Sequence, residues 1–280
     1  MSGAIEFDLD NLKNVFRETG LHNPRGEFYS ARKHKHKQVF DYIIQLESAF
    51  KKLSTKRPIV MVDCGCGKSY LSFILYEYCR SVLKRDIKII GIDNNATLIE
   101  KCRAIAQALG FEQMEFFDAS VGEFKSKDPV DIVYSLHACN TATDQTIAQG
   151  IQLGAKYIFS VSCCQHRNRQ LIKNHPLTAL TRFQPYKERI VDMVGDSLRA
   201  LLLEEQGYGV NLFEFTSAEQ TPKNIMLRGI KNKVKKVDKE SAHASYQQLV
   251  ELFNFSPALE EYLQDALTAK TATPINLSSG

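Results

Sequence analysis

The sequence predicts an α/β protein with a doubly wound, seven-stranded and mostly parallel sheet, extended by helices at both ends. Two observations favour this fold. Short apolar segments alternate with segments of helical length and periodicity between residues 59 and 161, and repeated β-then-α units give parallel strands joined by right-handed helical crossovers. Acidic side chains also follow three of the predicted strands, at the edge of a parallel sheet where ligands bind.

The composition sets the limits within which this fold is expected. At 280 residues, of which 24% are charged, the chain has room for one α/β core with additional elements. It has no run of roughly 18 apolar residues, so we expect no membrane-spanning helix, and the acidic N-terminus differs from a signal peptide. The seven cysteines lack the spacing of a disulfide framework, and Cys163 and Cys164 are adjacent. We therefore expect a reducing, cytoplasmic setting.

The positive charge is concentrated near the N-terminus. The whole chain has a formal net charge of +4, and residues 1–57 alone contain eleven Lys and Arg against seven Asp and Glu. The densest run consists of Arg32, Lys33, Lys35 and Lys37, and a second basic run spans 231–236. Such runs are typical either of solvated surfaces or of nucleic-acid contacts, and the sequence leaves both interpretations open.

The segment 1–57 is expected to form a basic helical extension. Residues 9–18 predict a short helix. Apolar residues then recur at spacings of three and four between 37 and 53, which gives a helix with one buried face. These residues are Val39, Ile43, Leu46, Phe50 and Leu53.

The segment 58–236 is expected to form the α/β domain. Its first five strands are predicted at 59–62, 87–92, 114–117, 130–136 and 157–161. The intervening helices are predicted at 70–83, 96–109 and 143–153, and Gly110 and Gly154 suit the caps of the last two. A polar stretch after residue 162 leads to a helix at 186–206 and an antiparallel closing pair of strands at 210–215 and 224–230. In the last segment, 237–280, we expect a helix at 238–265 followed by a disordered tail.

The first predicted strand runs into a glycine-containing turn that opens a helix. The turn reads Asp63-Cys64-Gly65-Cys66-Gly67-Lys68-Ser69. Glycines in such a turn allow the backbone to approach a ligand closely. The turn lacks the GxxxxGK[ST] spacing of a phosphate-binding loop. Asp63 instead offers a carboxylate that can receive a cation, such as an amino group.

Further carboxylates follow the next two strands. Asp93 and Asn94 end the second strand, and Asp118 and Ala119 end the third. An acidic residue after the second strand of such a sheet is placed to hold the hydroxyl groups of a ribose. All these residues should line one crevice at the carboxyl edge of the sheet.

This arrangement resembles the class I S-adenosylmethionine-dependent methyltransferases, whose Rossmann-like domain carries [DE]xGxGxG in the first turn. Here the first two glycines, Gly65 and Gly67, are kept, and Ser69 replaces the third. The resemblance implies that Asp63 receives the methionine amino group, that Asp93 and Asn94 bind the ribose, and that Asp118 and Ala119 lie near the adenine, with His137 also beside the cofactor. The alternative, an NAD-binding Rossmann domain, prefers GxGxxG and has no use for Asp63.

A finer resemblance involves the ends of the fourth and fifth strands. The segments Leu136–Asp144 (LHACNTATD) and Ser162–His166 (SCCQH) are similar to paired motifs of the eukaryotic tRNA 2′-O-methyltransferases that modify the acceptor stem, and of related methyltransferase-like proteins. Leu136 replaces a lysine of that pattern, and Asn140 replaces a glycine. The tRNA enzymes also carry cysteine and histidine zinc-binding elements that this sequence lacks.

These two segments supply the candidate catalytic residues, which are His137, Asp144, Cys163, Cys164 and His166. Either histidine has the chemistry to take a proton from the acceptor, although each also suits a plain hydrogen bond to a neighbouring loop. A cysteine thiolate could attack C6 of a pyrimidine ring. Zinc binding is disfavoured because adjacent cysteines chelate poorly, so we expect no metal. The remaining alternative is that the cysteines pack as small apolar groups.

The function expected from these features is methyl transfer from S-adenosylmethionine to RNA, either tRNA or rRNA. Arg32, Lys33, Lys35 and Lys37 would contact the phosphate backbone. The alternatives are a methyltransferase acting on a protein or a small molecule, and a non-catalytic protein that binds S-adenosylmethionine. The sequence does not identify the acceptor atom or the oligomeric state.

Overall fold

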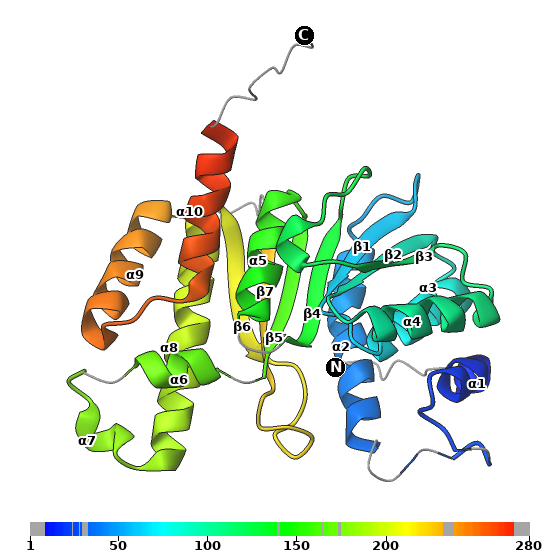
Figure 1. Cartoon of the computed structure of the whole chain (residues 1–280), viewed down its shortest axis with the longest axis horizontal. Coiled ribbons are helices and arrows are strands. Elements are labelled where there is room, and N and C mark those ends of the chain that lie inside the picture. Colours follow the sequence, from blue (N-terminus) through cyan, green and yellow to red (C-terminus); the bar gives the residue numbers. More distant parts are fainter. Residues whose placement is uncertain are drawn as a thin grey trace.

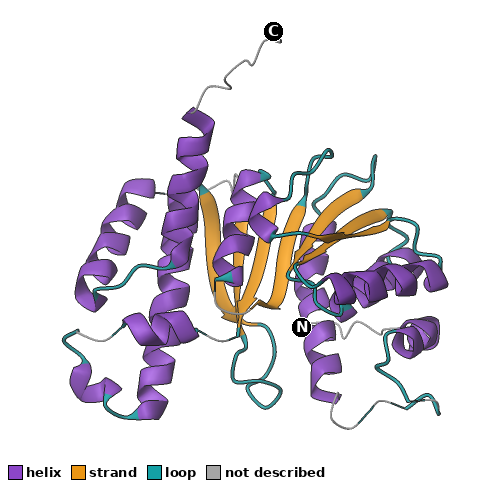
Figure 2. Cartoon of the chain, in the orientation of Figure 1, coloured by secondary structure: helices purple, strands orange, loops and turns teal. Residues whose placement is uncertain are grey.

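The chain folds around a seven-stranded sheet with helices on both faces (Figures 1 and 2). The computed structural model describes residues 9–271, apart from 24, 28, 30–32, 139–140, 164, 173–174 and 232–237. The strand order is β3-β2-β1-β4-β5-β7-β6. The strands are β1 (Ile59–Cys64), β2 (Ile87–Asp93), β3 (Met114–Asp118), β4 (Ile132–Ala138), β5 (Tyr157–Ser162), β6 (Tyr208–Glu214) and β7 (Ile225–Lys231). This architecture confirms the predicted fold class.

Strand β7 is the antiparallel member of the sheet. It lies between β5 and β6 and pairs antiparallel with both, whereas β1 to β5 pair parallel to one another. The order changes direction at β1, because β2 lies on one side of it and β4 on the other. In open α/β sheets, ligands bind beside the carboxyl ends of the strands at such a change of direction, here the ends of β1 and β4.

One face of the sheet is covered by helices from the N-terminal part of the chain. These are α1 (Leu9–Glu18), α2 (Lys33–Phe50), α3 (Tyr70–Ser81) and α4 (Ala96–Leu109). They share a core cluster with alternate strand residues such as Ile59 and Met61. Tyr42 of α2 fixes this packing, since its hydroxyl donates to the backbone oxygens of Ser135 and Phe159, at 3.1 Å each. The N-terminal helices are thus part of the same hydrophobic core as the sheet.

The other face is covered by later helices. They are α5 (Ala142–Gln152), α8 (Gln184–Glu205), α9 (Lys239–Phe253) and α10 (Ala258–Thr271), and α9 packs on α8. Val60 and Val62 of β1 point into this second cluster, while Ile59 and Met61 point into the first. Burial on both faces explains why the parallel strands read as continuous apolar runs.

Two parts of the helical pattern differ from the sequence prediction. The prediction of a single helix at 238–265 is wrong, because α9 ends at Phe253 and α10 begins at Ala258. Asn254 caps α9 in a left-handed conformation (φ 46°), and Pro257 follows. The polar stretch after β5 also contains two short helices, α6 (His166–Leu171) and α7 (Thr178–Thr181). They were not predicted because the sequence has no apolar periodicity there.

Other expectations concern membrane-spanning helices, disulfides, and segments outside the described residues. Within the described residues, no helix combines the length and apolar character that crossing a membrane requires. None of the described cysteines forms a disulfide. The expected disordered tail, residues 271–280, lies outside the described part apart from Thr271, the last residue of α10. Most of the basic run 231–236 also lies outside it.

Candidate active site

The carboxyl ends of the parallel strands bring the predicted carboxylates to one edge of the sheet. Asp93 and Asp118 are direct partners in the register of β2 and β3. Asp63 pairs with Gly91 on β2, two residues before Asp93. In Figure 1 this edge lies at the bottom of the sheet, together with the N-terminal end of α2 and the loop between β6 and β7.

The turn after β1 has three residues in the left-handed region. Their φ angles are 68° at Gly65, 54° at Gly67 and 53° at Ser69, the residue before α3. A glycine adopts this conformation without penalty, whereas a residue with a Cβ pays roughly 1–2 kcal/mol. Ser69 therefore takes the backbone shape of the third glycine in the methyltransferase pattern. Its hydroxyl compensates in part, because it lies 3.4 Å from the carboxylate of Asp63.

Close packing beneath the turn requires Gly91 in β2. A Cβ at this position would lie 2.5 Å from the ring of Phe116 and 3.2 Å from the sulfur of Cys66. The first turn rests on this strand, since the backbone N–H groups of Gly65 and Cys66 both donate to the oxygen of Ile92, at 2.8 and 3.0 Å. The Gly91-Ile92-Asp93 sequence thus fixes the height of the glycine turn above the sheet.

Asp93 connects the first turn with the second. One carboxylate oxygen accepts from the N–H of Gly67 at 2.8 Å, and the other from the N–H of Asn95 at 3.0 Å. Asn95 in turn caps α4 by accepting from the N–H of Leu98. The carboxylate is half-buried and keeps further lone pairs for a ligand, so it can receive the two hydroxyl groups of a ribose.

The residues expected near the adenine lie beside Asp93. The N–H of Ala119 donates to the backbone oxygen of Asp93 at 3.1 Å, which joins the third turn to the second. The side chains of Asn94 and Asp118 are exposed. Phe117, next to Asp118, is also exposed, and its ring lies 5.6 Å from that of Phe124. The third turn therefore offers both polar groups and aromatic surface.

Asp63 differs from the other two carboxylates because it is buried. It accepts hydrogen bonds from Ser72 and Ser69, and Ser72 is also 2.7 Å from the hydroxyl of Tyr134. Burial raises the pKa of Asp63 to about 7, against the opposing effect of the two serine hydroxyls. A buried carboxyl of this kind is stabilised as an anion when a cation binds beside it, which fits an amino-group ligand.

We expect S-adenosylmethionine to bind less tightly as the pH falls below 7, because Asp63 must lose its proton to receive the ligand's ammonium group. The ammonium lowers the pKa of Asp63 from its value of about 7 in the free protein. Below that pKa, binding therefore releases a proton, and the Kd rises by up to about tenfold per pH unit. Calorimetry in two buffers of different ionisation enthalpy measures the release; Asp63→Asn should abolish it, and equal heats for the wild type would contradict the assignment.

His137 lies where β4 ends and is held in an uncommon backbone conformation. Its φ is 62°, and the register of β4 against β5 shifts between Leu136 and Ala138. The ring Nε2 is 3.0 Å from Oε1 of Gln38 in α2. Because the amide nitrogen of Gln38 donates to the backbone oxygen of Gln220 at 3.0 Å, its oxygen must face His137, and Nε2 must therefore carry the proton. The observed contact is the hydrogen bond to a neighbouring segment, and the role of base stays a prediction.

The second candidate segment meets the first at Cys163. Its sulfur lies 3.5 Å from the backbone oxygen of His137, so the ends of β4 and β5 are adjacent at the carboxyl edge. Cys164 lies outside the described residues, as do Cys139 and Asn140, and the side chain of His166 is not described. The proposed nucleophilic and basic roles of these residues stay predictions. Among the described residues, no group of three or more metal-ligating side chains converges.

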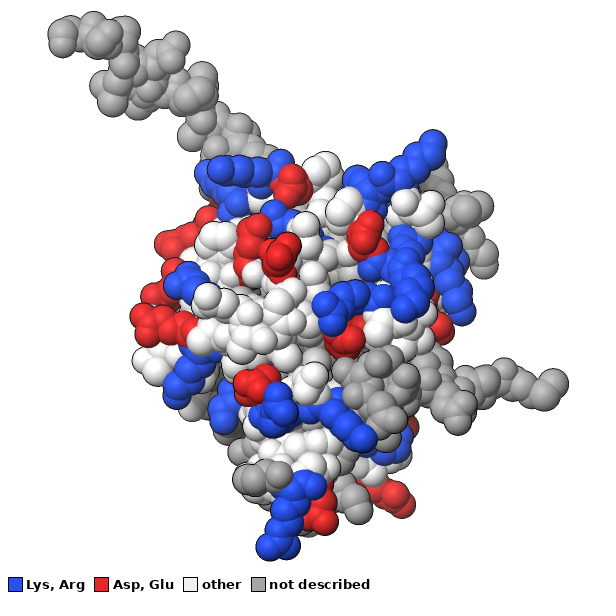
Figure 3. Space-filling view, turned by 90° about the vertical axis from the view of Figure 1, so that its right-hand side faces the viewer, with Lys and Arg blue, Asp and Glu red and all other residues white. Residues whose placement is uncertain are grey.

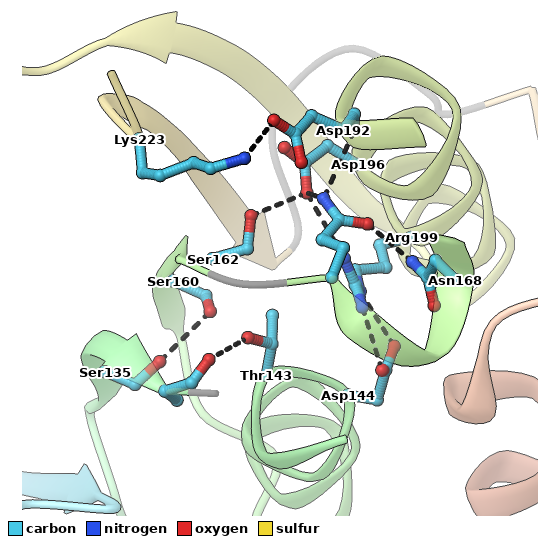
Figure 4. A network of polar contacts seen from close by, with 12 residues as sticks. Ser135, Thr143, Asp144, Ser160, Ser162, Asn168, Asp192, Asp196, Arg199 and Lys223 are labelled. Atoms are coloured by element: carbon cyan, nitrogen blue, oxygen red, sulfur yellow. Dashed lines mark hydrogen bonds and ion pairs between the residues drawn. The ribbon is translucent and has the colours of Figure 1, made fainter. Parts of the chain in front are cut away.

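The structure corrects the expectation for Asp144. Its carboxylate is buried against Arg199 of α8, with distances of 2.8 and 2.9 Å to Nε and Nη2 (Figure 4). Both side chains are 2% exposed. Since a two-point ion pair with Arg199 engages both of its oxygens, Asp144 is a positioning residue for the first turn of α5, which follows β4.

Three residues on one face of α8 hold the loops of the carboxyl edge, as Figure 4 shows. Arg199 binds Asp144 after β4, and Asp196 accepts from Ser162 at the end of β5, at 2.9 Å. Asp192 pairs with Lys223 in the turn between β6 and β7. The spacing of four and three residues places all three side chains on the same side of the helix.

Gly195 completes this face of α8. A Cβ there would lie 2.0 Å from Oε1 of Gln165 and 2.6 Å from Nδ2 of Asn168. The loop after β5 therefore packs directly against the helix backbone. Sequence reasoning missed Arg199, Asp196 and Gln38 because no local motif marks them; their partners lie far away in the chain.

Comparison with known proteins supports the chemistry that this geometry indicates. Residues 34–170 match the family model described as a methyltransferase domain. This stretch runs from α2 to α6 and contains every candidate cofactor-binding and catalytic residue, from Asp63 to His166. The family-model match and the fold together indicate a methyltransferase of the Rossmann-like class. The protein is an enzyme that uses S-adenosylmethionine as its methyl donor.

Solved structures with a similar arrangement were also found. They include magnesium protoporphyrin IX methyltransferase from Synechocystis PCC 6803 with bound SAH (13% identity, 80% of this chain, 100% of that chain, TM-score 0.49). An rRNA methylase from Streptococcus thermophilus (10% identity, 68% and 95%, TM-score 0.41) and a SAM-dependent methyltransferase from Aquifex aeolicus (12% identity, 76% and 95%, TM-score 0.40) are further examples. Structural similarity at such low sequence identity does not identify the methyl acceptor of this protein. A comparison with curated protein sequences gave no match.

Proposed function

We propose that this methyltransferase acts on RNA. The observation that carries the proposal is the position of α2, which begins at Lys33 and also contains Lys35 and Lys37 of the basic run. The hydrogen bonds of Gln38 to His137 and Gln220 fix this part of α2 at the carboxyl edge of the sheet. Three lysines of the densest basic run in the sequence therefore belong to a helix whose Gln38 contacts the loops that would receive the acceptor.

The site supplies the parts that methyl transfer requires. Asp63 and Asp93 would hold the amino group and the ribose of S-adenosylmethionine, which leaves the sulfonium facing the ends of β4 and β5. A nucleophilic oxygen or nitrogen of the acceptor then bonds to the methyl carbon as the carbon–sulfur bond breaks, and S-adenosylhomocysteine leaves. The acceptor loses a proton in this step. The main contribution of the protein is to align donor and acceptor.

Side-chain contacts hold the segments at this edge of the sheet, which favours such alignment. The end of β5 and the turn between β6 and β7 are tied to α8 through Asp196 and Asp192. The first turn of α5, which follows β4, is tied to the same helix through Asp144. Lys37 lies at the exposed end of α2 and pairs with Asp41, whose carboxylate also accepts from Thr216. The basic start of α2 is thus anchored to the same edge.

Methyl labelling tests the proposal directly. Purified protein is incubated with S-adenosylmethionine that carries a radioactive methyl group and with total RNA or total protein from the source cells. We expect label in the RNA fraction, which ribonuclease releases and protease does not. Label confined to the protein fraction or to small molecules would overturn the RNA assignment and leave the methyltransferase assignment intact.

We expect the lysines at the start of α2 to supply part of the RNA affinity. Replacing Lys33, Lys35 and Lys37 by glutamine should weaken RNA binding and reduce the slope of log K against log salt by about 2, since each phosphate contact contributes about 0.7 to 0.9. Fluorescence anisotropy between low and physiological salt measures both quantities.

The matched control replaces Lys51, Lys52 and Lys56, which are exposed near the amino ends of the strands. This control variant should keep the affinity and the salt slope of the wild type. An equal loss in both variants would show that the contribution is not specific to α2.

A further inference from the structure

The segment between β5 and the middle of α8 has a larger net positive charge than the chain as a whole. Residues 166–189 contain six Lys and Arg and one Glu, a formal charge of +5, whereas the chain as a whole has +4. The segment comprises α6, α7 and the first turns of α8. From its charge, exposed rings and position, we infer that this segment, called here the α6–α8 surface, binds single-stranded RNA. The inference rests on the proposed function.

Two buried side chains support the described part of the α6–α8 surface. Ile172 is buried, and so is His175, whose Nδ1 accepts from the N–H of Leu177 at 3.1 Å. The other ring nitrogen of His175 is 3.2 Å from the hydroxyl of Thr181, and its ring lies 5.2 Å from that of Phe253 in α9. These contacts hold α7 against the body of the molecule from beneath.

Aromatic and apolar side chains point outward from this support. Phe183 is 52% exposed, Tyr186 is 51% exposed and Leu180 is 49% exposed. The two rings meet edge to face, with centroids 6.2 Å apart. Burying such rings would be favourable, so their exposure together indicates a surface that takes up a ligand. Flat rings present faces on which any nucleobase can stack.

Some Lys and Arg side chains of this segment form ion pairs with glutamates, and others do not. Arg167 binds Glu261, and Arg169 binds Glu188. Over the residues that the structure describes, Arg182, Lys187 and Arg189 form no ion pair. The guanidinium of Arg182 instead lies 5.1 Å above the ring of Phe183. Cations next to exposed rings suit a strand whose bases stack while its phosphates are neutralised.

The location of the α6–α8 surface fits this partner. Helix α6 begins directly after the loop of Cys163, and α6 and α7 lie on the bottom side of the molecule in Figure 1, as the carboxyl edge does. The opposite end, over α1, α3 and α4, carries Lys and Arg side by side with Asp and Glu (Figure 3). A strand on the α6–α8 surface would therefore lead toward the ends of β4 and β5, where the methyl group is transferred.

A protein partner or a second copy of the chain is the alternative occupant of an exposed aromatic surface. The excess of cations favours RNA, because a matching protein surface would have to be strongly acidic, and the excess also repels a second copy of the same surface. Both alternatives are outcomes of the experiment below.

The experiment uses the full chain and a fluorescent oligouridine of about 12 nucleotides, long enough for one single-strand site. One variant combines Phe183→Ala with Tyr186→Ala, and a second combines Arg182→Gln, Lys187→Gln and Arg189→Gln. The aromatic variant should bind about tenfold or more weakly with an unchanged salt slope. The charge variant should also bind more weakly, and its salt slope should fall by about 2, from three contacts at about 0.7 each.

Two matched controls separate these effects from general ones. Leu252→Ala removes another exposed apolar side chain, from α9, and Lys51→Gln, Lys52→Gln and Lys56→Gln remove three exposed cations elsewhere. Both controls should bind oligouridine as the wild type does. Because the replaced side chains are at the surface, all variants should fold. Melting curves check that each of them does.

Several results would overturn the inference. They are wild-type affinity in both surface variants, salt-independent binding by the wild type, and self-association that Phe183→Ala with Tyr186→Ala abolishes. If the wild type methylates RNA and the surface variants do so equally well, the inference fails and the proposed function stands. If the wild type binds oligouridine through this surface but labels no RNA, the RNA acceptor fails and the binding surface stands.

Discussion

Replacing Asp93 by alanine is expected to weaken S-adenosylmethionine binding by about 100-fold or more. The carboxylate would accept two charge-assisted hydrogen bonds from the ribose, each contributing roughly 1.5–3 kcal/mol. It also accepts from the N–H groups of Gly67 and Asn95, so the variant loses the link between the first two turns. Titration calorimetry measures the Kd, and circular dichroism checks that the variant is folded.

Two further variants make this test specific. Asp93→Asn keeps the shape but loses the charge and one acceptor, so its Kd should lie between those of the wild type and Asp93→Ala. Glu100→Ala removes an exposed carboxylate from α4, close in sequence, and should leave the Kd unchanged. An Asp93→Ala protein that is folded and binds S-adenosylmethionine like the wild type would refute the assignment of the ribose site.

Replacing Arg199 by methionine is expected to lower the free energy of unfolding by about 3–5 kcal/mol, the usual cost of leaving buried charges unpaired. The guanidinium is 2% exposed and faces two carboxylates, Asp144 and Asp196. Burial raises the pKa of Asp196, and Arg199 is the main influence that opposes this rise. Without the cation, both acids must take up protons or water must enter. Urea denaturation followed by circular dichroism measures the loss.

A second substitution distinguishes the ion pair from simple packing. Asp144→Leu in the Arg199→Met background removes the orphaned carboxylate, so the double variant should be more stable than Arg199→Met alone. Arg167→Ala, which breaks the exposed pair with Glu261, should cost about 1 kcal/mol or less. If Arg199→Met costs no more than Arg167→Ala, the buried pair does not hold the loops as described.

The sequence was sufficient for most of the sheet and its helices because their signals are local. Buried parallel strands appear as short apolar runs, and Gly110 marks the end of α4 with a left-handed φ of 65°. The break between α9 and α10 was missed because Asn254 and Pro257 lie within a stretch of otherwise suitable helix residues. Helices α6 and α7 are short, and their supports lie elsewhere, as the contact of His175 with Phe253 shows.

The cofactor side of the site was predictable, and the acceptor side was less so. Three carboxylates after three successive strands must gather at one edge of a parallel sheet, whatever the details of packing. By contrast, the partner of Asp144 is 55 residues away, and the partner of His137 is 99 residues away in the opposite direction. No local spacing encodes such pairs. The sequence alone therefore does not distinguish a catalytic aspartate from one that forms a buried structural ion pair.

The position of S-adenosylhomocysteine in a crystal of its complex with this protein tests the central claim most directly. We predict ribose hydroxyls within hydrogen-bonding distance of Asp93, the amino group beside Asp63, and the sulfur facing the ends of β4 and β5 near His137 and Cys163. A ligand bound elsewhere on the molecule, or one whose ribose lies away from Asp93, would contradict the account.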